Sequence, residues 1–295
     1  YGGSGLGVTE ASILLHEICA AGAGTSGASP IHFYVFPPMP LIKHGSEALK
    51  RRFLPRIAAG DIIMSFGVTE PNAGTDTSRI QTRAEKKGNR WIINGRKVWT
   101  TNAQHATCIL LLARTTPREE VAAKPFKGMT LFFADFDRSR ITVREIEKLG
   151  RAAVDSNEIF IDNLEVPEED VVGQVGEGFY HLLDSLNPER ILTGIEAVGI
   201  GKAALERAVQ YAKERVVFDR PIRKNQAIAH PLAQAWARLE TAELMCWKAA
   251  WLFDHGRPCG AESNTAKLMA AEAGFEACDV ALQTFGGYGY AKEFY

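Results

Sequence analysis

The sequence lacks long apolar runs, an excess of charge of one sign, and cysteines at metal-binding or disulfide-framework spacing. No stretch of about 18 or more apolar residues occurs, which argues against a membrane span. The formal net charge is −1 and no Lys- or Arg-rich run is present, so neither nucleic acid nor an anionic membrane is indicated as a partner. The five cysteines show no CxxC or Cys/His pattern, which predicts reduced thiols, no metal site, and a compartment such as a bacterial cytoplasm or a mitochondrial matrix.

What the sequence does have is the composition of an ordinary globular chain. Its 295 residues are 46% hydrophobic, which is enough to bury more than one core. Residue 1 is Tyr, and the "GGSGLG" that follows fits no signal-peptide pattern. We therefore expect the chain to begin inside a longer protein.

Three zones with different apolar periods follow one another along the chain. In residues 8–59 apolar residues recur at intervals of three and four, which predicts helices. From 62 to 166, short apolar runs such as "IIMSFGV" predict strands, with hairpin turns at Lys87-Gly88-Asn89 and Asn94-Gly95. From 175 onward three long amphipathic helices are predicted, with Gly256 as a stop signal.

Helices, strands and helices in separate blocks predict an α+β fold, not the alternation of a doubly wound fold. The predicted domains are a helical domain at 1–61, a β domain at 62–172 and a helical bundle at 173–295.

Two polar motifs interrupt the strands of the β domain. "FGVTEPNAGTD" (66–76) predicts a strand that ends in a turn of small polar residues, which by itself only reverses the chain. Its backbone N–H groups and hydroxyls also suit a planar heterocycle or a phosphate. "WTTN" (99–102) adds an indole and two hydroxyls, although a lone Trp is more often part of a core. Both motifs in one β domain favour a ligand site.

A carboxylate near the start of a predicted helix also needs an explanation. In "SLNPERILTG", Asn187 suits an N-cap and Pro188 the first helical position, which places Glu189 in the first turn. There an acid complements the helix dipole without doing any chemistry. Position alone does not decide between this role and a catalytic one.

Taken in order, these segments resemble the acyl-CoA dehydrogenase family over essentially the whole chain. The matching segments are "YGGSG", "SFGVTEPNAGTD", "INGRKVWTTN", "KLGRAAVDSNEIFIDNLEVPEEDVVG", "GEGF", "YAKERVVFDRPIRKNQAI" and "LQTFGGYGY". The resemblance implies a partial N-terminal helical domain, a β-barrel-like middle domain and a partial C-terminal four-helix-bundle domain. It also implies non-covalent FAD and the oxidation of an acyl-CoA to a trans-2-enoyl-CoA, as in fatty acid β-oxidation, with an electron-transfer flavoprotein as acceptor.

The resemblance also implies roles for individual residues of the middle domain. Phe66, Val68 and Thr69 correspond to a strand end against the flavin ring. Trp99 and Thr101 correspond to residues that stack on the isoalloxazine and donate hydrogen bonds to it. Thr75 stands at the acyl-CoA entrance.

Further cofactor contacts are implied to come from a neighbouring subunit of a homodimer or homotetramer. The corresponding residues are Arg215, Phe218, Gln226, Gln283 and Gly287. From the residues alone, Arg215 also suits a solvated helix face, and "FGGYG" suits a helix C-cap. The chain departs from the family at Asp219, where glycine is usual, and Asp tolerates a left-handed backbone better than most residues.

The same resemblance bears on the catalytic base. Much of the family takes its base from a Tyr-Glu-Gly segment that would lie beyond Tyr295. An isovaleryl- and long-chain-acyl branch instead uses a Glu directly before an Arg at the head of the first long bundle helix, which corresponds to Glu189 and Arg190. We expect Glu189 to be the base and Arg190 a substrate-binding or structural partner. A flavin oxidase or monooxygenase, or a non-catalytic assembly protein of the same fold, remains an alternative.

Overall fold

The computed structural model describes residues 1–294, and the chain packs into two compact units. The first unit, here the sheet unit, comprises Tyr1–Gly5 and Phe33–Leu186. The second, here the bundle unit, comprises Leu6–His32 and the chain from Asn187 onward. The predicted helical domain at 1–61 is thus divided between the two units, and its boundaries stay a prediction.

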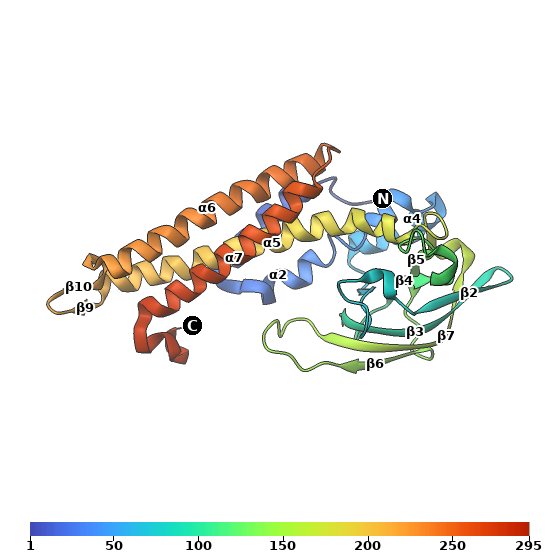
Figure 1. Ribbon diagram of the computed structural model, residues 1–295, viewed down its shortest axis with the longest axis horizontal. Coiled ribbons are helices and arrows are strands. Elements are labelled where there is room, and N and C mark those ends of the chain that lie inside the picture. The colour runs from blue at the N-terminus through green and yellow to red at the C-terminus, as the bar shows by residue number, and fades with distance from the viewer. Residues whose placement is uncertain (295) are drawn as a thin grey trace. The chain divides into compact units, whose positions relative to one another are not determined.

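The sheet unit is built on one eight-stranded sheet in the order β6-β7-β3-β2-β4-β5-β8, with β1 paired to β4 (Figure 1). Most neighbours are antiparallel, but β1 and β2 both run parallel to β4. The strands are β1 (Met64–Gly67), β2 (Arg83–Lys87), β3 (Arg90–Thr101), β4 (Cys108–Arg114), β5 (Met129–Asp135), β6 (Ile141–Glu145), β7 (Ser156–Pro167) and β8 (Val171–Val172).

The apolar runs in the sequence become the strands with both faces covered. Every residue of β4 is buried, and its alternate side chains enter two different core clusters. Leu110 and Leu112 face a cluster that includes Phe53 of α4 (Glu47–Ala59), whose ring lies 4.6 Å from that of Phe133. A short helix, α3 (Met39–His44), precedes α4, and 3-10 turns lie at Thr77–Arg79, Arg118–Val121 and Glu168–Asp170.

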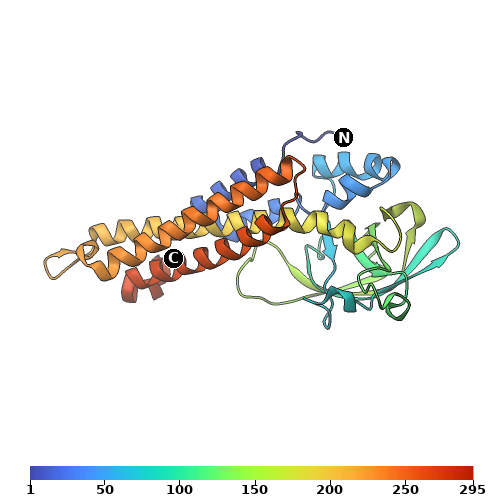
Figure 2. The ribbon, with the colours of Figure 1, turned by 45° about the horizontal axis from the view of Figure 1, so that its top comes forward.

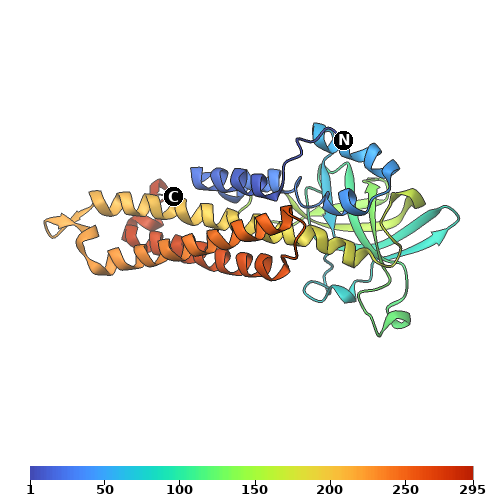
Figure 3. The same cartoon turned by 90° about the horizontal axis from the view of Figure 1, so that it is seen from above.

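The bundle unit consists of helices that lie side by side (Figures 2 and 3). They are α1 (Val8–Ile18), a π-helical segment (Cys19–Ala23), α2 (Gly24–His32), α5 (Gly178–Glu214) from Asn187 onward, α6 (Gln226–Asp254) and α7 (Gly260–Phe285). The helices approach closely because small residues face one another: a Cβ at Gly274 would lie 2.6 Å from the Ala197 carbonyl oxygen.

The remaining elements lie at one end of the bundle. A hairpin of β9 (Val216–Val217) and β10 (Arg220–Pro221) joins α5 to α6, followed by a 3-10 turn (Ile222–Lys224). Two more 3-10 turns, Gly286–Tyr290 and Lys292–Phe294, follow α7.

The predicted α+β class and the three long helices are confirmed, as are the hairpin at Lys87-Gly88-Asn89 and the stop near Gly256. Lys87 pairs with Arg90 across the hairpin, and α6 ends at Asp254, two residues before Gly256 at φ +63°. Among the described residues, no helix is long and apolar enough to cross a membrane.

The predicted turn at Asn94-Gly95 is wrong. Both residues lie inside β3, where the pairing with β7 shifts by one residue between Ile93 and Gly95. An added Cβ at Gly95 would lie 2.6 Å from the Thr82 Cα. This glycine permits the close approach of two backbones at a β-bulge and is not needed for a reversal of the chain.

The predicted start of the long helix at Asn187-Pro188 is also wrong, because α5 begins at Gly178. A Cβ at Gly178 would lie 2.6 Å from the Thr130 carbonyl carbon, so the helix begins where only glycine fits against β5. Apolar burial of Leu182 and Leu186 in the sheet unit supports the extra turns. Pro188 therefore lies within the helix, and Glu189 is not in a first turn.

Candidate functional site

Trp99 is the most unusual residue of the sheet unit. Its backbone φ is +61°, in the left-handed region that bulky residues rarely adopt, at a second register shift of β3 between Lys97 and Thr100. The side chain is 59% exposed, so the indole is not part of the core. An exposed aromatic residue held in a strained backbone is typical of a ligand site. The interpretation of Trp99 as an ordinary core residue is thereby excluded.

The structure brings the two polar motifs together beside Trp99. The Val98 N–H donates to the Thr69 carbonyl at 2.9 Å, and the Ser65 hydroxyl donates to the Thr101 carbonyl at 3.0 Å. The end of β1 and the end of β3 therefore lie side by side. Phe66, Val68, Thr69, Trp99 and Thr101, which are the five residues predicted for the flavin ring, all lie in these two adjoining segments.

A buried ion pair joins the same two segments. The Lys97 side chain is fully buried, and its ammonium donates to the Val68 carbonyl and to Glu70 Oε1, both at 2.9 Å. Glu70 also accepts from the backbone N–H groups of Gln81 at 2.6 Å and Thr82 at 2.9 Å. The pair thus fixes the β1 end, the β3 bulge and the start of β2 to one another.

Burial disfavours the charged form of both partners, but the net shift of the pKa opposes the charged form of Lys97 alone. Burial lowers the pKa of Lys97 to about 8, although Glu70 opposes the change. Burial also disfavours ionised Glu70, but Lys97 and the donors from Thr82 and Gln81 outweigh it and lower the Glu70 pKa. Glu70 therefore stays a carboxylate at neutral pH, with the ammonium beside it.

Thr75 lies in the exposed turn that continues from the β1 end. The turn is closed by a bridge between Glu70 and Ala73, and Ser78 donates to Asp76 at its far end. Thr75 is exposed, as a residue at an entrance must be.

Glu189 and Arg190 lie in the bundle unit, inside α5, and both are half-buried. The Thr193 hydroxyl donates to the Glu189 carbonyl at 2.8 Å, and Arg190 donates to the Asn187 side chain at 3.1 Å. Because α5 starts at Gly178, a role for Glu189 in complementing the dipole of a first turn is excluded.

The residues predicted for a neighbouring subunit's cofactor lie at one end of the bundle unit. The structure brings Arg215 and Gly287 together around a cavity of about 610 Å³, where the Arg215 guanidinium lies 5.8 Å from the Tyr288 ring centre. Gln226 begins α6 and Gln283 lies in the last turn of α7, both exposed.

The hairpin tip at this end is built from two residues in the left-handed region. Phe218 has φ +53° and a 93% exposed side chain, and Asp219 has φ +59°. Asp219 thus adopts the geometry for which the family's glycine is suited.

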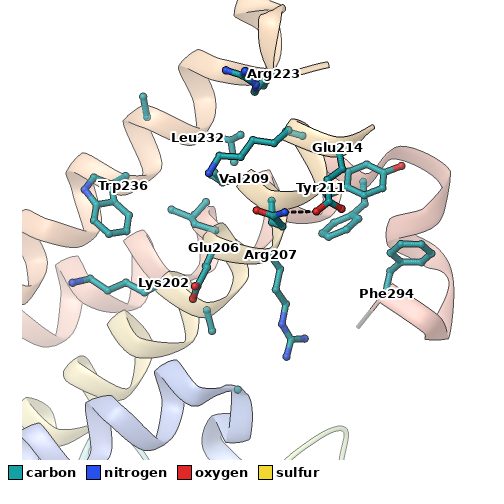
Figure 4. Close-up of a pocket in the computed structure, with 18 of the residues that line it drawn as sticks. Lys202, Glu206, Arg207, Val209, Tyr211, Glu214, Arg223, Leu232, Trp236 and Phe294 are labelled. Atoms are coloured by element: carbon teal, nitrogen blue, oxygen red, sulfur yellow. Dashed lines mark hydrogen bonds between the residues drawn. The ribbon is translucent and has the colours of Figure 1, made fainter. Parts of the chain in front are cut away.

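A larger groove of about 1440 Å³ lies along the bundle between the π-helical segment, α5 and α6. Figure 4 shows Lys202, Glu206, Arg207 and Trp236 around it. Lys202 is held by Glu240 at 2.9 Å, and its ammonium lies 5.4 Å from the Trp236 ring centre. The groove mixes both signs of charge with apolar surface, and none of the predicted site residues lines it.

Two buried pairs were not predicted from the sequence. One is Glu70 with Lys97, and in the other His32 Nδ1 lies 2.6 Å from Glu196 Oε1. Ionisable residues at apolar positions of a strand or helix are the signal that could have indicated them. Their partners are 27 and 164 residues away, so the sequence pattern did not reveal the pairing.

Comparisons with known proteins match the whole chain. Three family models fit in order: "Acyl-CoA dehydrogenase, N-terminal domain" at 1–61, "middle domain" at 65–164 and "C-terminal domain" at 176–295. Acyl-CoA dehydrogenase fadE12 of Mycobacterium bovis is 38% identical, over 100% of this chain and 75% of the relative. An acyl-CoA dehydrogenase of Bacillus subtilis is 36% identical, over 100% of this chain and 76% of the relative.

Solved structures agree with these sequence matches. A glutaryl-CoA dehydrogenase in complex with glutaryl-CoA has a TM-score of 0.92 at 32% identity, over 99% of this chain and 74% of that one. PigA in complex with FAD has a TM-score of 0.92 at 27% identity, over 99% and 76%. The prolyl acyl carrier protein oxidase AnaB has a TM-score of 0.93 at 28% identity, over 99% and 77%.

Proposed function

Because this chain belongs to the acyl-CoA dehydrogenase family, we propose that it oxidises an acyl-CoA thioester to the trans-2-enoyl-CoA with FAD as cofactor. The observation that carries the proposal is the exposed indole of Trp99, held at φ +61° beside the β1 end. This pairing of a strained aromatic residue with small polar residues fits a planar, polar-edged ring system.

The residues of the sheet unit fit the flavin in three ways. The Trp99 indole offers a flat surface for stacking, which is typical of sites for planar rings. Thr69 and Thr101 offer hydroxyl donors. Phe66 and Val68, in the same segment as Thr69, offer half-buried apolar surface. Donors near the ring stabilise negative charge that develops when it accepts electrons.

Glu189 is the proposed base that takes the α-proton of the acyl-CoA. A C–H beside a thioester is a weak acid, so its removal needs a carboxylate shielded from water and donors on the thioester oxygen. FAD supplies the acceptor for the hydride that leaves the β-carbon. Arg190 and Thr75 are the proposed substrate-binding residues, with Arg190 placed directly after the base.

The electrons are proposed to pass to an electron-transfer flavoprotein, and the active form is proposed to be a homodimer or homotetramer. Arg215, Phe218, Gln226, Gln283 and Gly287 then complete the cofactor site of a second subunit. Since both named relatives are bacterial, a bacterial cytoplasm is the proposed location.

A flavin oxidase is the second candidate, favoured by the likeness to a protein described as a prolyl acyl carrier protein oxidase. The two functions differ in how fast the reduced enzyme reacts with oxygen. A dehydrogenase with acyl-CoA bound should reoxidise slowly in air-saturated buffer, whereas an oxidase should reoxidise within a turnover and release hydrogen peroxide.

The test is to mix the FAD-loaded protein anaerobically with a panel of acyl-CoAs and to identify the product by mass spectrometry. We expect flavin bleaching and a product two mass units lighter than the substrate, which is the loss of two hydrogens. Bleaching by none of the thioesters would refute the proposal.

A further inference from the structure

A buried histidine–glutamate pair of the bundle unit lies on the same face of α5 as Glu189. His32, at the end of α2, is 5% exposed and Glu196 is 3% exposed, and His32 Nδ1 lies 2.6 Å from Glu196 Oε1. Residues three and four apart share one face of a helix, so Glu189, Thr193 and Glu196 follow one another along α5. At a rise of 1.5 Å per residue, Glu196 lies about 10 Å from Glu189 along the helix axis.

The same face of α5 is closed in the other direction. Ser185, four residues before Glu189, is fully buried, and its hydroxyl donates to the Phe36 carbonyl at 2.7 Å. Leu182, one further turn back, is buried in the core of the sheet unit. An acyl group with its α-carbon at Glu189 therefore has room along α5 only toward Glu196.

The far end of this face is closed by the π-helical segment as well as by α2. Burial, and after it the charge of Glu196, raises the pKa of the buried Cys19 thiol to about 12, so Cys19 lies close to Glu196. The Cys19 thiol also donates to the Gly24 carbonyl at 3.5 Å. An alkyl chain that reached this end would push against packed helices and buried polar atoms, which gives it no further gain from burial.

We propose that the His32–Glu196 pair ends the acyl subsite, so that the substrate carries a short acyl group of the size of butyryl to hexanoyl. The proposal rests on the proposed function, because it names the acyl group of the same substrate. Thr193, which is half-buried between Glu189 and the pair, lines the course of the chain. Its hydroxyl donates to the Glu189 carbonyl at 2.8 Å, so its one O–H is already used and an apolar chain loses nothing by passing it.

A dicarboxylic acyl group such as glutaryl is the competing substrate class, and the pair is less suited to it. His32 Nδ1 already faces Glu196, so a carboxylate at the end of the acyl group would meet a second carboxylate in a buried site. Two carboxylates that share a buried site repel each other unless one of them takes up a proton. An uncharged chain end avoids this cost.

The experiment uses the FAD-loaded full chain and measures how binding depends on chain length. S-ethyl-, S-hexyl- and S-decyl-CoA are thioethers, which lack the carbonyl that acidifies the α-C–H, so calorimetric titration measures their binding without a reaction. The double variant His32→Ala/Glu196→Ala opens the end of the subsite, and Thr193→Leu narrows its course. The matched control is His16→Ala, which replaces a buried histidine of α1 that lies 3.4 Å from Glu243 of α6.

Each methylene that is buried in an apolar subsite should strengthen binding about fourfold. We expect the parent to bind S-hexyl-CoA at least about tenfold more tightly than S-ethyl-CoA, but S-decyl-CoA no more tightly than S-hexyl-CoA. The double variant should bind S-decyl-CoA at least about tenfold more tightly than S-hexyl-CoA. Thr193→Leu should lose most of the gain between ethyl and hexyl, and His16→Ala should keep both ratios of the parent.

Parental binding that continues to strengthen from S-hexyl- to S-decyl-CoA would overturn the proposal. So would parental ratios in both variants, or faster flavin reduction by glutaryl-CoA than by butyryl-CoA. If the double variant does not fold, the parent series and Thr193→Leu decide. If no thioester reduces the flavin, the proposed function fails, and the thioether titrations still decide whether the pair limits the subsite.

Discussion

At the scale of single residues, the proposed flavin site depends on the backbone of Trp99. A left-handed backbone at a bulky residue costs roughly 1–3 kcal/mol, which the surrounding strands must supply. The exposed indole recovers little of this cost by burial, since 59% of it meets solvent. The strain is understandable if the indole is held for a ligand.

We expect Trp99→Ala to weaken FAD binding by about 1–3 kcal/mol, by analogy with aromatic stacking on planar bases. Trp99→Gly should lose similar affinity, yet its apo form should be no less stable than the parent, because glycine adopts φ +61° without strain. FAD titration and urea unfolding measure the two effects. Parental FAD affinity in both variants would show that the indole is not the platform.

The Glu70–Lys97 pair gives a pH dependence with a defined sign. Burial lowers the Lys97 pKa from 10.5 to about 8, so between these pH values the unfolded chain binds a proton that the folded chain does not. Stability contributed by Lys97 therefore rises with pH across this window, by at most about 3 kcal/mol. The double variant Lys97→Met/Glu70→Gln has no ionisable side chain at either position. Over this pH range the parent's free energy of unfolding, measured by urea unfolding, should therefore rise relative to that of the double variant.

Removing only one partner of this pair should be worse than removing both. Lys97→Met leaves Glu70 buried without its cation and should cost about 3–5 kcal/mol in urea unfolding at pH 7, most of which the double variant recovers. If the loss of stability in the double variant equalled the sum of the losses in Lys97→Met and Glu70→Gln, the two groups would not interact.

The motifs, together with the family resemblance, predicted that Phe66, Val68, Thr69 and Thr101 gather with Trp99, and the structure places all of them in two adjoining segments. The motifs were not enough to predict the support beneath these segments. Lys97 lies at a position of β3 that faces inward, and its burial depends on Glu70, which comes from the turn after β1. Such a pairing is a property of the folded sheet.

At the scale of elements, local signals predicted the type of each element better than its ends. The Asn-Gly dipeptide usually makes a hairpin, but here it lies in β3, where Gly95 packs against Thr82. Pro188 usually starts a helix, but here ten residues of α5 precede it, because the apolar face of Leu182 and Leu186 extends the helix backward. Tertiary packing overrides the local preference in both cases.

The β3 bulge can be tested with Gly95→Ala. The added methyl group would lie 2.6 Å from the Thr82 Cα, so two backbones must separate, at a cost of about 1–3 kcal/mol of stability. Gly74→Ala is the matched control, since a Cβ there meets nothing within 4 Å and its φ is not positive. Equal stabilities of the two variants in thermal unfolding would contradict the close approach.

At the scale of the whole molecule, the predicted cofactor residues fall in two separate groups. One group lies in the sheet unit around Trp99, and the other lies at one end of the bundle unit around Arg215 and Gly287. The proposed explanation is that the second group serves the cofactor of a neighbouring subunit.

Arg215→Ala should therefore lower FAD occupancy and oligomer stability together, because one arginine would serve both. Light scattering combined with the absorbance ratio of flavin to protein measures both quantities on one sample. A monomer fully loaded with FAD would contradict a site shared between subunits.

In the proposed function, Glu189 removes the α-proton during an FAD-dependent oxidation of acyl-CoA. The most direct measurement is anaerobic stopped-flow flavin reduction by Glu189→Gln, a variant that keeps the shape of the side chain and removes its basicity. We expect FAD to stay bound while reduction slows by at least about a hundredfold, the lower end for loss of a general base. Reduction of the bound flavin at the parental rate would contradict this role of Glu189 and assign the proton transfer to another residue.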